Sequence, residues 1–223
     1  MTAATGRRPV VIAVDGPAAS GKGTLARRLA RHFGYAHLDT GLLYRAVGAA
    51  VRRAGGDPED AGAAEAAARA LDPASLDDPI LRTDDAANDA GKVAAIPAVR
   101  RALLDFQRDF ARNPPGGAPG AVLDGRDIGT VICPDADAKI FVEAEVAERA
   151  RRRVKELRER GVTAIHAAVL RDMEARDARD RGRSVAPLVP ADDAFLLDST
   201  GLDADAAFAA ALKFIESRSK KQA

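Results

Sequence analysis

The segment Gly16–Thr24 reads Gly-Pro-Ala-Ala-Ser-Gly-Lys-Gly-Thr and constrains the fold of this chain more than any other stretch. An apolar, mostly β-branched run precedes it at residues 10–14, and a helical pattern of apolar residues follows at 22–33. The glycines therefore lie at a turn from a buried strand to a helix. Backbone N–H groups of such a loop, the N-terminal end of the helix and a lysine together bind phosphate groups. The alternative is a glycine-rich turn that only connects two elements, and the agreement of all these features disfavours it.

The end of this loop departs from the commonest phosphate-binding pattern. That pattern has Ser or Thr directly after the lysine, whereas here Gly23 separates Lys22 from Thr24. The Gly-Lys-Gly-Thr ending resembles the nucleoside monophosphate kinases and disfavours a GTPase switch or a motor ATPase. We expect the whole loop to bind nucleotide phosphates, through Gly16, Pro17, Ala18, Ala19, Ser20, Gly21, Lys22, Gly23 and Thr24.

The composition disfavours several classes of partner. The 223 residues include 34 basic and 33 acidic side chains, so the overall charge favours neither nucleic acid nor an anionic membrane. The single cysteine, Cys133, is expected to be a small buried residue in a reducing compartment. No apolar run approaches the roughly 20 residues of a membrane span, and the first nine residues lack a signal peptide's apolar stretch. The sequence therefore predicts a cytoplasmic protein.

The apolar patterns predict five short strands separated by helices. This alternation is typical of a doubly wound parallel sheet in an α/β fold. The predicted strands are residues 10–14, 35–39, 121–124, 139–142 and 195–199. The predicted helices are residues 22–33, 60–71, 145–160, 163–181 and 203–215, one that starts at Thr40, and one from about Thr83 to Phe110 that breaks near Pro97. Residues 113–120 and 125–130 are expected to be loops.

Polar residues follow two of the predicted strands. Asp124, Arg126 and Asp127 lie at the carboxyl end of one strand, which is where ligands bind in open α/β sheets. Thr40 and Arg45 begin the helix after another strand. The Thr40 hydroxyl has two interpretations here, because it can cap the helix or, together with Arg45, hold a phosphate.

Residues 149–183 carry twelve basic and six acidic side chains, and Gly161 divides them into two helical halves. A cationic helical hairpin of this kind can close over bound nucleotides as a lid. The alternative is a solvated hairpin with i,i+4 ion pairs such as Glu156 with Arg160. We favour the solvated interpretation for most single arginines, but not for the cluster of Arg176, Asp180 and Arg183.

Six blocks of sequence together resemble the bacterial cytidylate kinases, in the order of that family and over residues 10–200. The blocks are the loop at 16–24, Leu-Asp-Thr-Gly-Leu-Leu-Tyr-Arg at 38–45, Lys-Val-Ala-Ala-Ile-Pro-Ala-Val-Arg at 92–100, Asp-Gly-Arg-Asp-Ile-Gly-Thr at 124–130, the stretch from Arg176 to Leu188, and Leu-Asp-Ser-Thr at 197–200. The resemblance implies a kinase that transfers a phosphoryl group from magnesium-bound ATP to CMP or dCMP, acting as a monomer.

The resemblance also implies roles for single residues. Lys22, Arg126 and Arg176 would be catalytic, and Thr40, Arg45 and Arg126 would face the acceptor phosphate. Arg100, Asp127 and Arg183 would recognise cytosine, and Arg176 and Asp180 the sugar. We expect Thr24 and Asp124 to position Mg²⁺, Asp124 through water because it ends a strand, and the alternative for Asp124 is a structural hydrogen bond to the loop. One kinase domain at 1–223 would comprise a core at 1–55, 112–145 and 186–223, an acceptor-binding insert at 56–111 and a lid region at 146–185.

Two features depart from the family pattern. Gly91 stands where the family often has a serine that contacts the base, and residues 56–111 lack the alternating β-branched run that would predict a small accessory sheet. His32, His37 and His166 have no carboxylate paired with them in the sequence, so we expect surface or helix-end positions. Kinases for UMP, AMP or shikimate, and a nucleotide-regulated RNA-binding protein, are the alternative functions.

Overall fold

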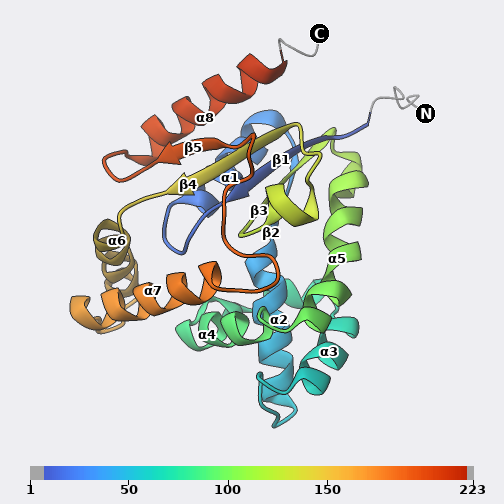
Figure 1. Cartoon of the computed structure of the whole chain (residues 1–223), viewed down its shortest axis with the longest axis vertical. Helices are drawn as coiled ribbons and strands as arrows, with labels where there is room; N and C mark the ends of the chain where they lie inside the picture. Colours follow the sequence, from blue (N-terminus) through green and yellow to red (C-terminus); the bar gives the residue numbers. More distant parts are fainter. Residues whose placement is uncertain (1–7, 220–223) are drawn as a thin grey trace.

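One five-stranded parallel sheet lies at the centre of the protein, as the computed structural model of residues 8–219 shows (Figure 1). The strands are β1 (Val10–Asp15), β2 (Ala36–Asp39), β3 (Gly120–Gly125), β4 (Ala138–Glu143) and β5 (Phe195–Asp198). Their order is β2-β3-β1-β4-β5, and every neighbouring pair is parallel. The predicted fold class is confirmed. Residues 1–7 and 220–223, the ends of the predicted domain, lie outside the described residues.

Strand β1 is buried on both faces because its alternate residues enter two different cores. Val11 and Ala13 pack in one core, whereas Ile12 and Val14 pack in the other. Helices α1 (Lys22–Phe33) and α8 (Ala204–Ser219) cover the face of Ile12 and Val14. Helices α2 (Thr40–Arg53) and α5 (Pro97–Arg112) cover the opposite face. The sheet therefore carries helices on both sides, as a doubly wound fold requires.

Residues 56–111 are helical, with α3 and α4 below the sheet in Figure 1 and α5 running up beside it. They comprise α3 (Ala61–Arg69), the short 3₁₀ turns η1 (Pro73–Asp77) and η2 (Pro79–Arg82), α4 (Asp84–Val93) and most of α5. The predicted break near Pro97 is confirmed, because Pro97 starts a new helix after a short connection. Residues 56–111 are all described and include no strand.

Helices α6 (Val146–Glu159) and α7 (His166–Arg181) form the predicted hairpin. The hairpin lies beside α4 in Figure 1, and two polar contacts join it to residues 56–111. Arg153 pairs with Asp84 at the start of α4, and an Nη atom of Arg160 donates to the carbonyl of Arg82 at 3.0 Å.

Among residues 8–219, no helix combines the length and the apolar character that crossing a membrane requires.

The segment after β3 corrects one prediction. We expected a loop at residues 125–130, but a short π-helical turn, η4, spans Ile128–Ile132. The buried Asp15 carboxylate accepts hydrogen bonds from the N–H groups of Ile128 and Gly129 at 2.8 and 2.7 Å, which holds the start of this turn. A contact between residues so far apart in the chain leaves no local pattern. A smaller correction is the 3₁₀ turn η3 (Pro115–Gly117) inside the loop expected at residues 113–120, whose last residue begins β3.

Candidate functional site

The phosphate-binding loop connects β1 to α1 and packs against β4. A Cβ atom on Gly16 would lie 2.1 Å from the carbonyl oxygen of Val142, so only glycine fits this approach. Ala19 and Gly21 have positive φ angles of 57° and 90°, which turn the chain into α1. One wall of a cavity, here called the donor cavity, is lined by Ala18, Ala19, Gly21, Lys22, Gly23 and Thr24. Gly16, Pro17 and Ser20 are not among the residues that line it, and the Pro17 carbonyl accepts a hydrogen bond from Lys22 Nζ at 3.3 Å.

A second cavity, here called the acceptor cavity, adjoins the first. All eight residues predicted to bind the acceptor line it, although they come from four separate segments of the chain: Thr40, Arg45, Arg100, Arg126, Asp127, Arg176, Asp180 and Arg183. Five residues line both cavities: Lys22, Gly23, Arg45, Arg126 and Arg176. The shared wall therefore carries four cationic side chains, which include the three predicted catalytic residues.

Asp180 organises two arginines of the acceptor cavity. Arg126 Nε donates to Asp180 Oδ2 at 2.9 Å, and Arg183 donates to the other oxygen of the same carboxylate. Burial by itself raises the pKa of Asp180, but the neighbouring Arg126 and Arg183 outweigh it and lower that pKa. The carboxylate is therefore ionised and holds both guanidinium groups in place.

A second buried ion pair joins α5 to the end of β3. Arg100 donates to the Asp127 carboxylate and, at 3.2 Å, to the carbonyl of Ala94. Its guanidinium carbon also lies 5.5 Å from the centre of the Tyr44 ring. Because both partners of the ion pair are buried, each fixes the orientation of the other.

Of the four cations between the cavities, only Arg126 has a carboxylate partner among the described residues, and Arg45 donates to the carbonyl of Leu81 at 2.7 Å. Arg176 makes no hydrogen bond among residues 8–219, and its Nε atom is buried without a partner. Burial, followed by the charge of Arg126, lowers the pKa of Arg176 to about 10. The same two causes, in the same order, lower the pKa of Lys22 to about 7. An anion bound here would stabilise the charged form of both groups, so the region is suited to phosphate.

The carboxyl ends of β2 and β3 correct two predictions. Asp39, not Thr40, caps α2, because its side chain accepts from the N–H of Gly41, whereas the Thr40 hydroxyl donates to the carbonyl of Asp124 at 2.8 Å. The prediction for His37 was also wrong, because its Nε2 atom lies 2.8 Å from Asp124 Oδ2. Burial, followed by the charge of Asp124, raises the pKa of Asp39. The cap is local, whereas the contacts of Thr40 and His37 with Asp124 join segments more than 80 residues apart, so no local pattern in the sequence shows them.

Within the part of the chain that the structure describes, no three His, Cys, Asp or Glu side chains cluster closely enough to hold a metal ion by themselves. Magnesium bound to a nucleotide needs fewer, because it takes one or two protein oxygens together with phosphate oxygens and several waters. Asp124 Oδ1 lies 3.7 Å from the place of a Cβ on Gly23, and Thr24 lines the donor cavity. These oxygens fit magnesium that arrives with the donor nucleotide.

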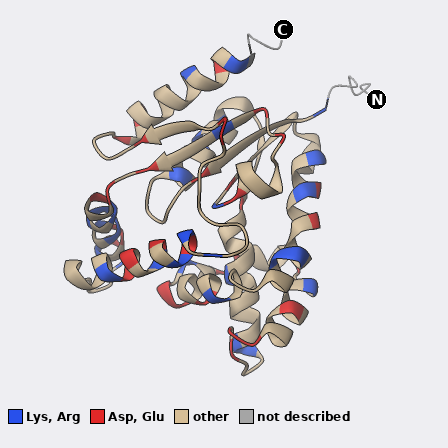
Figure 2. Cartoon of the chain, in the orientation of Figure 1, with Lys and Arg blue, Asp and Glu red and all other residues tan. Residues whose placement is uncertain are grey.

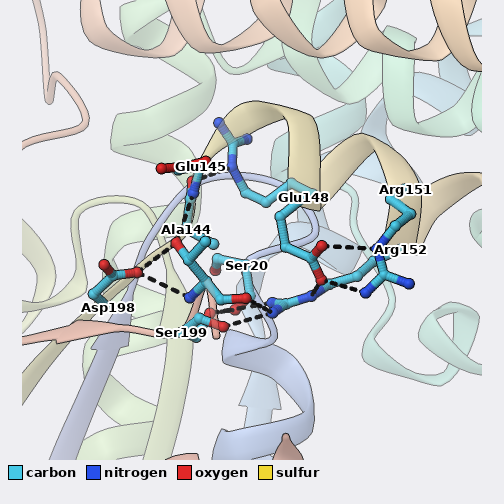
Figure 3. A network of polar contacts seen from close by, with 10 residues as sticks. Ser20, Ala144, Glu145, Glu148, Arg151, Arg152, Asp198 and Ser199 are labelled. Carbon is cyan, nitrogen blue, oxygen red and sulfur yellow. Dashed lines mark hydrogen bonds and ion pairs between the residues drawn. The ribbon is translucent and has the colours of Figure 1, made fainter. Parts of the chain in front are cut away.

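The hairpin is tied to the phosphate-binding loop by arginines that we expected to be solvated. Figure 3 shows Arg152 reaching Ser199, whose hydroxyl donates to the carbonyl of Ser20 at 2.9 Å. Hydrogen bonds from Arg151, partly opposed by desolvation, and from Arg152 lower the pKa of Glu148 to about 2. The base of α6 is therefore fixed to the loop and to the end of β5.

Arg149 is the second arginine of this kind, and its assignment to the solvated face was wrong. Its guanidinium donates to the carbonyls of Ala18 and Ala144 and pairs with both oxygens of Asp177 on α7.

Asp15, whose carboxyl group holds the start of η4, was also missed by the sequence analysis. An acidic side chain that ends a buried strand was a usable signal for Asp15, because a buried polar group needs hydrogen-bond donors. Arg149 had no such signal within a run of arginines.

Cys133 is buried as predicted, and burial raises the pKa of its thiol to about 11.

A family model described as cytidylate kinase matches residues 12–217. The chain belongs to the cytidylate kinase family. Two relatives of this family are similar over nearly their whole length. The cytidylate kinase of Paramagnetospirillum magneticum is 63% identical over 208 residues, which cover 93% of this chain and 98% of the relative. The cytidylate kinase of Rhodospirillum rubrum is 61% identical over 212 residues, which cover 95% of this chain and 100% of the relative.

A solved structure supports the fold assignment of this family member. An uncharacterized protein from Eubacterium ventriosum is similar with a TM-score of 0.52 at 16% identity, covering 93% of this chain and 99% of that protein. At this identity the similarity concerns the fold alone. Family membership makes this chain a nucleoside monophosphate kinase, and the two adjoining cavities agree with an enzyme that binds two nucleotides.

Proposed function

We propose that this kinase transfers the γ-phosphoryl group of ATP to CMP or dCMP, giving ADP and CDP or dCDP, with Mg²⁺ bound to the ATP. The observation that carries the proposal is the wall that the donor and acceptor cavities share. Its four cations, Lys22, Arg45, Arg126 and Arg176, lie where a donor and an acceptor phosphate would meet. Phosphoryl transfer requires mainly positioning and stabilisation of charge, and this wall is suited to both.

The residues have separate tasks in the reaction. The loop at 16–24 binds the triphosphate, and Thr40, Arg45 and Arg126 hold the acceptor phosphate in line with it. An oxygen of the acceptor phosphate attacks the γ-phosphorus, the bond to the bridging oxygen breaks, and ADP leaves. No general base is needed, because the attacking phosphate is already an anion. Lys22, Arg126 and Arg176 stabilise the negative charge on the transferred group.

Other residues of the acceptor cavity bind the base and the sugar of the acceptor nucleotide. Asp127 accepts from the amino group of cytosine, and Arg100 and Arg183 donate to its carbonyl and ring nitrogen. Arg176 and Asp180 bind the sugar. The ion pairs that hold Asp127 and Asp180 support these roles, because a fixed carboxylate discriminates better between an amino group and a carbonyl than a mobile one.

Thr24 and Asp124 would hold magnesium, Asp124 through water. Magnesium supplies charge neutralisation to the phosphates when it is bound. Asp124 is in turn oriented by His37.

The division of the chain into parts is also a proposal. Residues 56–111 act as the acceptor-binding insert, and residues 146–185 act as a lid on a core formed by residues 1–55, 112–145 and 186–223. The acceptor cavity supports this division, because its walls come from all three parts. A monomeric state and a cytoplasmic location stay predictions from the sequence.

Substrate comparison tests the proposal. Turnover of CMP, dCMP, UMP, AMP and shikimate is measured at one fixed concentration of magnesium-ATP, and we expect CMP and dCMP to give the highest kcat/KM. A kcat/KM for UMP, AMP or shikimate equal to that for CMP would refute the assignment. Arg126→Ala should reduce turnover by at least 10³-fold while the Kd for ATP stays within about threefold. A large loss of ATP affinity would remove Arg126 from the acceptor site.

The RNA-binding alternative makes different predictions, namely salt-sensitive affinity for RNA and slow or absent phosphoryl transfer. The charge distribution favours the kinase. Figure 2 shows acidic and basic segments alternating along α6 and α7. Several basic side chains are also engaged within the hairpin, since Arg151 and Arg152 pair with Glu148 and Arg160 pairs with Glu156.

A further inference from the structure

Arg149, in the first turn of α6, is buried in spite of its charge, with only 2% of its surface exposed. Its guanidinium makes four hydrogen bonds. Nε donates to the carbonyl of Ala144 at 2.8 Å, and the two Nη atoms donate to the two carboxylate oxygens of Asp177. The fourth bond runs from Nη1 to the carbonyl of Ala18, in the phosphate-binding loop, at 3.2 Å. The ion pair with Asp177 therefore fixes a guanidinium that also holds the loop.

The bond to Ala18 sets the direction of one peptide group of the loop. The peptide between residues 18 and 19 is planar and trans, so the N–H of Ala19 points opposite to the Ala18 carbonyl and away from Arg149. Ala18 and Ala19 both line the donor cavity. Within residues 8–219, the N–H of Ala19 donates to no protein group, so it is available to a phosphate oxygen.

This direction of the peptide is unfavourable for the loop by itself. Ala19 has a φ of 57°, and a positive φ is disfavoured in a residue with a Cβ atom, because Cβ then crowds a backbone carbonyl. Half a turn of the 18–19 peptide group would return φ of Ala19 to the favoured negative range, but it would point a carbonyl where the N–H now points. Among the described residues, Arg149 alone donates to the Ala18 carbonyl, so it opposes this rotation.

We propose that Arg149 is a positioning residue for phosphoryl transfer, which keeps the peptide between Ala18 and Ala19 in the orientation that presents its N–H to the donor phosphates. The inference rests on the proposed function, because it takes the loop at 16–24 to bind the triphosphate. Arg149 is not among the residues that line the donor cavity. It acts on the nucleotide through the loop, and Asp177 keeps its guanidinium in place.

Steady-state kinetics with ATP and CMP test this role. Arg149→Lys keeps a positive charge beside Asp177 but lacks the planar fork that reaches both partners. It should lower kcat/KM for ATP by about tenfold, the factor expected when Ala19 loses the support for its positive φ. The KM for CMP should stay within about twofold. Arg151→Lys is the matched control, because Arg151 is exposed on the same helix and pairs with Glu148 alone among the described residues.

A glycine at residue 19 separates the proposed role from a general loss of structure. Glycine adopts positive φ without the steric penalty, so in the Ala19→Gly background Arg149→Lys should lower kcat/KM for ATP by less than about threefold. A purely structural Arg149 would give the same loss in both backgrounds. Equal losses would therefore overturn the inference.

A second variant replaces Arg149→Lys if that protein does not fold. Arg149→Met/Asp177→Asn removes the charges of both partners together, so no ion is left buried without its partner. We expect the same losses of about tenfold with Ala19 and less than about threefold with the glycine. All rates are measured well below the lowest Tm of the set, as determined by circular dichroism.

Other results would overturn the inference as well. It fails if kcat/KM for ATP falls no further in Arg149→Lys than in Arg151→Lys, or if the KM for CMP rises while kcat/KM for ATP stays at the wild-type value. The kinetics are measured with the acceptor that the wild type uses best, so a preference for UMP or AMP would refute the proposed substrate and leave this test intact. If the wild type transfers no phosphoryl group to any of these acceptors, the proposed function and the inference fail together.

Discussion

Removing Asp177 should destabilise the protein strongly, because it would leave the charge of Arg149 buried without its partner. The two side chains are only 3% and 7% exposed, and the guanidinium pairs with both carboxylate oxygens. Breaking a buried ion pair by removing one partner costs about 3–5 kcal/mol. For a chain of this length, each kcal/mol corresponds to roughly 2–4 °C in Tm. Asp177→Ala should therefore lower the Tm by about 10 °C.

Thermal unfolding followed by circular dichroism measures this change. Glu174→Ala is the matched control, because Glu174 is exposed on the same helix and has no partner among the described residues. The Tm of this variant should stay within about 2 °C of the wild-type Tm. The double variant Arg149→Ala/Asp177→Ala should lose less than the sum of the two single losses, because no charge is then left unpaired. A Tm of Asp177→Ala within 2 °C of the wild type would refute the reasoning.

The parts of the fold that the sequence predicted are those with a local signal. The run of β-branched residues, the glycines of the loop and the period of Leu25, Leu29 and Phe33 lie within one stretch of chain, and α1 has the predicted bounds Lys22–Phe33. Pro97 and Gly161 likewise mark a helix start and a helix end through backbone geometry alone. Such signals need no knowledge of the tertiary structure.

The missed contacts depend on which strands are neighbours. His37 and Asp124 are 87 residues apart, and they meet because β2 pairs with β3 in a register that sets Asp39 opposite Asp124. His37 lies two residues before Asp39, so it is the diagonal neighbour of Asp124 on the same face of the sheet. Five strands can be ordered in several ways, and the sequence does not state the order. The candidate acceptor residues were found in spite of this, since motif blocks identified them without the register.

Substitutions at three further positions test the contacts around the site. Burial raises the pKa of Asp15 to about 7 in the folded state, whereas its ordinary pKa is 3.8. Between these two pH values the folded state therefore keeps a proton that the unfolded state has lost. The wild type should therefore lose stability relative to Asp15→Asn between pH 4 and pH 7, by up to about 4 kcal/mol, and a constant difference in urea unfolding would contradict this. His37→Leu should cost about 1–3 kcal/mol in the same assay, because it leaves a buried Asp124 oxygen without its donor, and His37→Gln should recover part of the loss. Gly16→Ala should abolish ATP binding or folding, because its Cβ would meet the Val142 carbonyl at 2.1 Å, and that backbone oxygen cannot move without shifting β4. Gly201→Ala is its control, since nothing lies within 4 Å of a Cβ there. Equal ATP affinity and equal Tm for the two alanine variants would mean that the loop does not pack against β4 as described.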